Sequence, residues 1–95
     1  MIDIDTAKKL TLEAAKQDLG GTLPFEIGIN EKYIEESEDG WIIFWNTKDF
    51  LETGDIMKAV APGLGRIGIT KSGKIVHFMS GYSDQECFEE LKEKN

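Results

Sequence analysis

The sequence contains few of the residues on which disulfides and metal sites depend. Among its 95 residues are one cysteine, Cys87, and one histidine, His77, so no disulfide can close within the chain. A lone free cysteine fits a reducing compartment. Neither residue has cysteine or histidine neighbours at metal-ligand spacing, and the motif context of Cys–His enzymes is missing. We therefore expect neither a metal nor another cofactor.

Long apolar runs are missing as well. The longest, Trp41–Trp45, has the length of one buried strand, whereas a membrane-spanning helix needs about 20 apolar residues. The chain begins Met-Ile-Asp-Ile-Asp, which is acidic where a signal peptide is basic. We therefore expect a cytoplasmic protein that does not contact a membrane.

Basic residues are outnumbered by acidic ones. The chain has 11 Lys and Arg against 18 Asp and Glu, which gives a net charge of −7. Nucleic acids and anionic membranes attract basic proteins, so neither is an expected partner. A basic protein partner suits the sign of the charge, although negative charge also serves solubility alone. The length suits one hydrophobic core, so residues 1–95 are interpreted as a single domain.

Two segments have the pattern of amphipathic helices. In Asp5–Leu19 apolar residues form one stripe with lysines outside it, and Gly20-Gly21 ends the helix. Near the C-terminus, Ser83-Asp84-Gln85-Glu86 has the capping-box pattern, with Ser at the N-cap and Glu three residues later. A short helix should follow, and its inward side chains are expected to be Cys87, Phe88 and Leu91.

Four runs between these helices have strand character and pair as two hairpins. Asn30–Glu36 and Trp41–Asn46 flank a turn that ends in Asp-Gly, which is typical of hairpins. Arg66–Lys71 and Lys74–Ser80 flank Ser72-Gly73 in the same way.

The remaining segments are connectors. Leu23–Ile29 contains Pro24 and is interpreted as a connector that could become a strand. Thr47–Asp55 is expected to be a loop or short helical turn that tucks Phe50 and Leu51 inward. Another turn of helix could run from Asp55 to Val60 and end at Ala61-Pro62-Gly63.

The second run, Trp41–Asn46, is apolar at both alternations of a strand. This pattern indicates a central strand that is covered on both faces, either by a helix and a loop or by a helix and a partner protein. One face should carry Trp41, Ile43 and Trp45, and the other Ile42 and Phe44.

The order of elements favours the α+β class. We expect an N-terminal helix, an antiparallel sheet of about four strands built as two hairpins, and a C-terminal helix. Both helices should lie on one face of the sheet.

Acidic residues gather around the first hairpin. They either complement a basic partner and speed the encounter, or belong to a solvated turn. A second acidic group follows Ser83, where a solvated helix face is the simpler interpretation. Tryptophan is frequent at interface hot spots, although at least one of the two tryptophans should lie in the core. The candidate partner-binding residues are Glu35, Glu36, Glu38, Asp39 and Trp45, and Glu31 also belongs to the first acidic group.

No set of residues has the pattern of an active site. Asp49, Glu52 and Asp55 lie close in sequence, and glycosidases use paired carboxylates. A chain this short does not easily build a deep cleft, however, and no histidine lies near them. Gly63-Leu64-Gly65 lacks both the phosphate-loop pattern and the helix that follows it. We expect no catalytic residues and no enzymatic activity.

The segment Gly40–Asp55 (GWIIFWNTKDFLETGD) resembles the signature of the YrhB-like immunity proteins. This is the family numbered thirty-five among the immunity proteins of bacterial polymorphic-toxin systems. The signature has a Gly-Trp pair, an aromatic-rich strand and a Tyr- or Phe-Leu-x-Thr-Gly-Asp-like segment. A Gly-rich stretch, a hairpin and a short helix follow it. The resemblance extends to about Leu91 and departs at Gly65-Arg66, where many relatives have Gly-Pro.

The resemblance implies a cytoplasmic immunity protein that binds a cognate toxin and neutralises it stoichiometrically. It implies no catalytic residues, and the shared residues are interpreted as holding the fold. The alternative is a small acidic chaperone or adaptor, which would expose an apolar patch and bind many proteins weakly. The toxin and the oligomeric state stay open. The shared residues are Gly40, Trp41, Thr53, Gly54 and Asp55.

Overall fold

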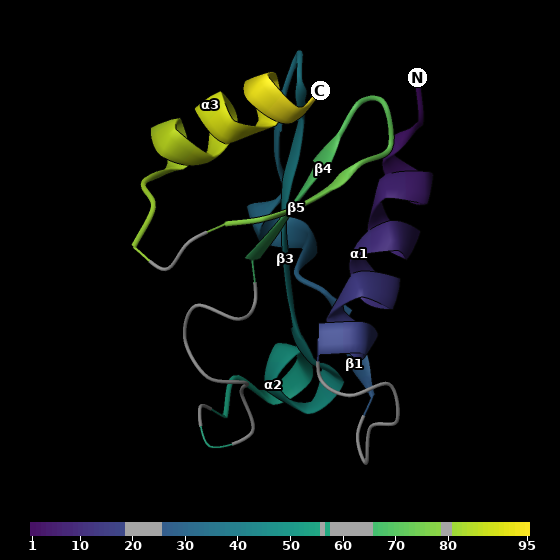
Figure 1. Cartoon of the computed structure of the whole chain (residues 1–95). Helices are drawn as coiled ribbons and strands as arrows, with labels where there is room; N and C mark the ends of the chain where they lie inside the picture. Colours follow the sequence, from purple (N-terminus) through teal and green to yellow (C-terminus); the bar gives the residue numbers. More distant parts are fainter. Residues whose placement is uncertain (19–25, 56, 58–65, 79–80) are drawn as a thin grey trace.

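A computed structural model describes residues 1–18, 26–55, 57, 66–78 and 81–95 (Figure 1). The predicted helix stop at Gly20-Gly21, the connector around Pro24 and the stretch 58–65 lie outside the described residues. In chain order the elements are α1 (Ile4–Asp18), β1 (Ile27–Ile29), the 3-10 helix η1 (Glu31–Tyr33), β2 (Glu35–Ser37), β3 (Gly40–Thr47), α2 (Lys48–Thr53), β4 (Arg66–Thr70), β5 (Ile75–His77) and α3 (Asp84–Lys94).

The strands form one antiparallel sheet of five strands in the order β1-β3-β4-β5, with β2 also paired to β3. The α+β class and both predicted hairpins are confirmed. The fifth strand is β1, because Ile27–Ile29 pairs with the end of β3. The first run is shorter than predicted, since residues 31–33 form η1 between β1 and β2. The five residues Asn30–Ile34 therefore lie opposite only Ile43 and Phe44, which makes η1 protrude from this edge of the sheet.

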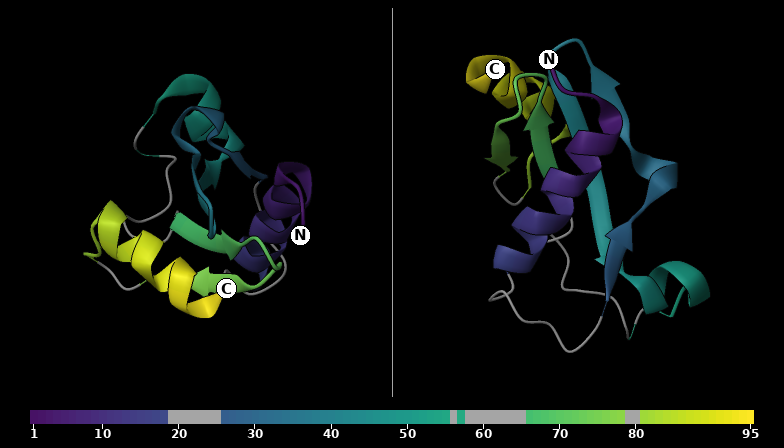
Figure 2. Two further views of the ribbon diagram at one scale, coloured as in Figure 1. Left: turned by 90° about the horizontal axis from the view of Figure 1, so that it is seen from above. Right: turned by 90° about the vertical axis from the view of Figure 1, so that its right-hand side faces the viewer.

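Both faces of β3 are buried, as the sequence predicts. Trp41, Ile43 and Trp45 lie in one hydrophobic cluster with the alanines of α1, whereas Ile42 lies in a second cluster with Cys87 and Leu91 of α3. The prediction that both terminal helices lie on one face is therefore wrong. Seen along the sheet, α1 and α3 lie on opposite sides of it (Figure 2, left). The physical reason is that each apolar face of β3 needs its own cover, and each terminal helix supplies one.

The helix α1 presents small side chains to the sheet. Ala7, Ala14 and Ala15 are buried against the face that carries both indole rings, so the large side chains come from the strand. The hydroxyl of Thr11 is also buried, and it donates to the Ala7 carbonyl at 2.8 Å. At the start of the helix, Asp3 accepts from the Thr6 amide, and this hydrogen bond lowers the pKa of the Asp3 carboxyl.

The helix α3 begins with the predicted capping box. Ser83 accepts from the Glu86 amide, and the Glu86 carboxylate accepts from the Ser83 amide, both at 3.2 Å. Beneath the helix, Gly68 lies between Ile42 and Val76 in the sheet. A Cβ atom at Gly68 would come within 2.4 Å of the Phe78 ring. This glycine therefore lets Phe78 and Leu91 pack closely against the sheet beneath α3.

The first hairpin turns at Glu38-Asp39, between the paired residues Ser37 and Gly40. Gly40 is thus the first residue of β3, and close packing against β4 requires a glycine at this position. A Cβ atom there would lie 2.3 Å from the Ile69 carbonyl oxygen of β4. The second hairpin closes across Ser72-Gly73 as predicted, and Gly73 has a φ of +94°.

Lys71 connects the two hairpin turns and the N-terminus. Its backbone amide donates to the Asp39 carbonyl at 3.0 Å, and its carbonyl accepts from the Ile2 amide at 2.9 Å. The ammonium group is paired with Glu36 and lies 4.1 Å from the centre of the Trp41 ring. This one residue therefore joins β2, the β4–β5 turn and the segment before α1.

We expect Trp41→Ala to lower the free energy of unfolding by about 3–5 kcal/mol, because it removes a large buried aromatic side chain. Trp41 is 3% exposed and lies under the Lys71 ammonium. Chemical denaturation measures the change, and Met57→Ala, at a side chain that is 88% exposed, is the control. A Trp41 variant as stable as the parent protein would contradict the assignment of Trp41 to the core.

Candidate protein-binding surface

The predicted acidic cluster of the first hairpin is divided between the two faces of the sheet. Successive residues of a strand point to opposite faces, and β2 contributes Glu35 and Glu36 in succession. Glu35 pairs with Ile42 and shares the face covered by α3, whereas Glu36 pairs with Trp41 and shares the face covered by α1. The two carboxylates therefore do not form one patch.

Glu36 is neutralised within the protein. The Lys71 ammonium pairs with it, and this contact holds the pKa of the Glu36 carboxyl below its usual range. Glu31 is also paired, since its carboxylate lies 2.7 Å from the Lys8 ammonium of α1. Internal lysines thus remove two of the predicted acidic residues from the free negative surface.

Glu35 lies in a confined position beneath the start of α3. One of its carboxylate oxygens is buried and has no hydrogen-bond partner within the described residues. Burial raises the pKa of the Glu35 carboxyl, the nearby charge of Asp84 raises it further, and Arg66 offsets part of the rise. Arg66 is itself engaged elsewhere: it donates to the Tyr82 carbonyl at 2.9 Å and lies 3.7 Å from Asp84. Glu35 is therefore half-buried, with its carboxylate held against the start of α3 and not presented at the hairpin tip.

Glu38 and Asp39 form the tip of the hairpin. Glu38 is exposed and Asp39 is partly exposed, and neither has an ion-pair partner in the part of the chain that the structure describes. Of the four hairpin carboxylates predicted to bind a partner, these two are free to do so. They directly precede the first residue of β3, a strand that is buried over most of its length.

Trp45 does not reach the surface. Its side chain is 2% exposed and packs in the cluster beneath α1. Among the described residues its indole nitrogen has no hydrogen-bond partner. The interpretation of Trp45 as a partner contact is therefore corrected. Both tryptophans belong to the core, because both side chains point to the face of the sheet that α1 covers.

The residues shared with the immunity-protein signature hold local structure. Gly54 has a φ of +73°, and its amide donates to the Phe50 carbonyl at 2.7 Å, which ends α2. The Thr53 hydroxyl donates to the Asp49 carbonyl at 2.6 Å and accepts from the Asp55 amide at 3.2 Å. Together with the packing of Gly40 and Trp41 described above, these contacts make the shared set a structural one.

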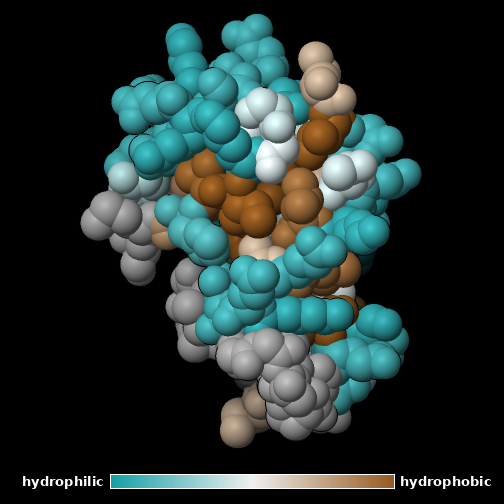
Figure 3. All heavy atoms as spheres, turned by 45° about the vertical axis from the view of Figure 1, so that its right-hand side comes forward, coloured by the Kyte–Doolittle hydropathy of each residue, from teal (hydrophilic) through white to brown (hydrophobic). Residues whose placement is uncertain are grey.

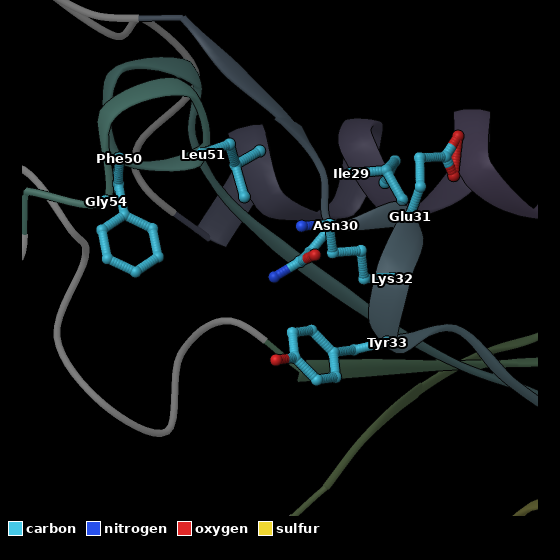
Figure 4. Close-up of a pocket in the computed structure, with 8 residues that line it drawn as sticks. All are labelled: Ile29, Asn30, Glu31, Lys32, Tyr33, Phe50, Leu51 and Gly54. Atoms are coloured by element: carbon cyan, nitrogen blue, oxygen red, sulfur yellow. The ribbon is translucent and has the colours of Figure 1, made fainter.

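A groove between η1 and α2 was not predicted. It has a volume of about 440 Å³ and lies on the same sheet edge as β2 (Figure 4). Tyr33 is 60% exposed at this site. An aromatic residue within the largely polar run Asn30–Glu36 is the one feature of the sequence that points to this site. The groove itself arises from the protruding η1, which strand periodicity does not predict. Its lining residues are Ile29, Asn30, Glu31, Lys32, Tyr33, Phe50, Leu51 and Gly54.

Comparison with known proteins gives no match: no family model, no curated protein and no solved structure matches this chain. Within the described ranges no helix is long and apolar enough to cross a membrane. In the same ranges no three His, Cys, Asp or Glu side chains are placed to share a metal ion. The function is therefore inferred from the two surface features above, the hairpin tip and the groove.

The two signature glycines should respond differently to substitution. Gly40→Ala should destabilise the protein by about 1–3 kcal/mol or more, because the new Cβ meets a backbone oxygen that cannot move aside. Gly54→Ala should cost about 1–2 kcal/mol through its left-handed backbone alone, since no atom lies within 4 Å of its Cβ position.

Asparagine separates these two causes, because it tolerates the left-handed conformation. Gly54→Asn should recover part of the stability lost in Gly54→Ala, whereas Gly40→Asn should recover none. Denaturation midpoints measure both pairs. Equal recovery at the two positions would refute the packing argument for Gly40.

Glu35→Gln should stabilise the protein at neutral pH. The raised pKa means that the folded state binds this proton more tightly than the unfolded state does. The protonated Glu35 therefore contributes to stability below the ordinary pKa of a glutamate. This contribution is lost as the pH rises through the raised pKa of Glu35 in the folded protein. Glutamine keeps the shape without the charge, so the urea midpoint should rise at pH 7 and converge with the parent in acid. Glu38→Gln, at the exposed tip, should change neither midpoint.

Proposed function

We propose that this protein binds one partner protein and inhibits it stoichiometrically, as an immunity protein does with its cognate toxin. The single observation that carries the proposal is the acidic tip of the first hairpin, whose carboxylates lack ion pairs in the part of the chain that the structure describes. Glu38 and Asp39 lack ion pairs within the described residues, while Glu36 and Glu31 are neutralised internally. The resemblance of Gly40–Asp55 to the immunity signature supports the same interpretation.

The hairpin tip is a suitable first point of contact with a basic protein. It is held by β3 and by the Lys71 amide, which donates to the Asp39 carbonyl, so little conformational freedom is lost on docking. Unpaired carboxylates at such a position attract a basic surface from a distance and raise the association rate. The partner is then a toxin with a basic face, met in the cytoplasm of the cell that the immunity protein protects.

A second candidate function is a chaperone or adaptor. Figure 3 shows apolar side chains reaching the surface of one face between hydrophilic ones. Two large hydrophobic residues, Met1 and Ile75, are 100% and 40% exposed. A chaperone uses such a surface to bind many unfolded chains weakly, whereas an immunity protein binds one folded partner tightly.

Charge reversal at the tip tests the proposal. After a pull-down has identified the partner, binding kinetics are measured for the double variant Glu38→Lys/Asp39→Lys across a salt series. At low salt the association rate should fall about tenfold or more. The difference should shrink as the Debye length falls to about 8 Å at physiological salt. Dissociation should change less.

The matched control is Asp49→Lys/Glu52→Lys, which changes the net charge equally on the exposed surface of α2. The eight residues of β3 separate α2 from the tip by about 25 Å, which is about three Debye lengths at physiological salt, so the two double variants are compared across the whole salt series. Equal slowing by both variants would mean that only net charge matters, and an unchanged association rate would make the tip a solvated turn. Weak capture of many unfolded proteins, with no tight partner, would favour the chaperone function instead.

A further inference from the structure

The groove between η1 and α2 brings polar and apolar groups together on one side of the sheet. Figure 4 shows the side chains of Asn30 and Lys32 pointing into the space bounded by Phe50, Leu51 and Tyr33. The residues come from segments on either side of β3 in sequence, and the η1 protrusion holds them opposite α2.

The polar groups of this groove are available to a ligand. Lys32 is exposed and has no ion pair within the described residues. Asn30 occupies the N-cap of η1, yet its side chain makes no capping hydrogen bond, and its backbone amide donates to the Phe44 carbonyl at 2.7 Å. The backbone of Asn30 is thus fixed while its amide group can both donate and accept.

The apolar wall is aromatic and partly exposed. The Tyr33 ring packs edge-on against Phe44, with ring centres 6.3 Å apart, and remains 60% exposed. Phe50 and Leu51 are half-buried on the facing side of α2. An unpaired ammonium, a free amide and an aromatic wall match a ligand with a carboxylate, a peptide N–H and an apolar side chain.

One chemical group carries all three of these features within a single residue: the apolar C-terminal residue of a polypeptide. Its carboxylate complements Lys32, its N–H can donate to the side-chain amide oxygen of Asn30, and its side chain suits the space beside Tyr33. The volume of about 440 Å³ is near the lower end of ligand sites, so it suits the end of a chain better than a long segment.

We propose that this groove captures the apolar C-terminal residue of the partner protein. The proposal rests on the proposed function, because it assigns the groove to that same partner. Charge at the hairpin tip then governs the encounter, and the groove, at the other end of β3, supplies an anchor that slows dissociation.

Three peptides test the groove without the partner. The probe is acetyl-Gly-Gly-Gly-Gly-Phe with a free carboxylate. One control has the same sequence with a C-terminal amide, and the other replaces Phe by Ser and keeps the carboxylate. Titrations of the whole protein are followed by amide NMR shifts. The free-acid Phe peptide should shift the signals of Asn30, Lys32, Tyr33 and Leu51 saturably, and both controls should bind about tenfold more weakly.

A matched pair of variants isolates the charge. Lys32→Gln should weaken the free-acid Phe peptide about tenfold and leave the amide peptide unchanged. Lys9→Gln, at an exposed lysine of α1 that has no ion pair in the described ranges, should alter neither. Equal binding of acid and amide peptides, shifts that map outside the groove, or no saturable shift at millimolar peptide would each overturn the proposal.

The identified partner then separates the two proposals. Lys32→Gln, or removal of the partner's last residue, should raise the dissociation rate and leave the association rate nearly unchanged. If the tip reversal slows association while Lys32→Gln and the peptides have no effect, the groove proposal fails and the proposed function stands. If the peptide binds and no tight partner exists, the proposed function fails, and the groove keeps only its affinity for an apolar chain terminus.

Discussion

Strand β3 is buried on both of its faces, and the placement of both terminal helices follows from this. Each face removes large apolar side chains from water only if another element covers it, and α1 and α3 each cover one. The neighbours of β3 are small where they must be close: alanines lie against the indole rings, and Gly68 lies under Phe78 and Leu91. Small residues at these positions therefore leave room for the large side chains that pack beside them.

The same strand determines where the two proposed contact features lie. The middle of β3 is enclosed by its neighbours. The two accessible features therefore lie near its ends, at the Glu38-Asp39 tip and at the groove beside α2. Lysines of the protein itself then restrict the acidic surface. Lys71 and Lys8 pair with Glu36 and Glu31, so among the acidic residues around the first hairpin the exposed carboxylates without an ion pair to any described residue are those at the Glu38-Asp39 tip. Both features are held by a scaffold that is rigid for reasons of packing.

Local signals in the sequence were sufficient for several elements. Alternation identified β3 as central and twice covered, the Ser83 capping box located the start of α3, and Asp39-Gly40 marked a hairpin. The strand pattern also predicts that Glu35 and Glu36 face opposite sides of the sheet, because adjacent strand residues point opposite ways. The η1 protrusion had no such signal: residues 30–36 were interpreted as one strand, and the groove was missed with them.

Periodicity and capping act over a few residues, so the sequence pattern alone indicates which residues need burial and which local turns they can make. Which helix covers which face depends on three-dimensional packing, since either apolar face of β3 could accept either helix on pattern alone. It also decided which carboxylates remain free. Glu36 meets Lys71 across 35 positions of the chain, and Glu31 meets Lys8 across 23. Ion pairs of such long range depend on strand register and helix placement, which exist only once the core has formed.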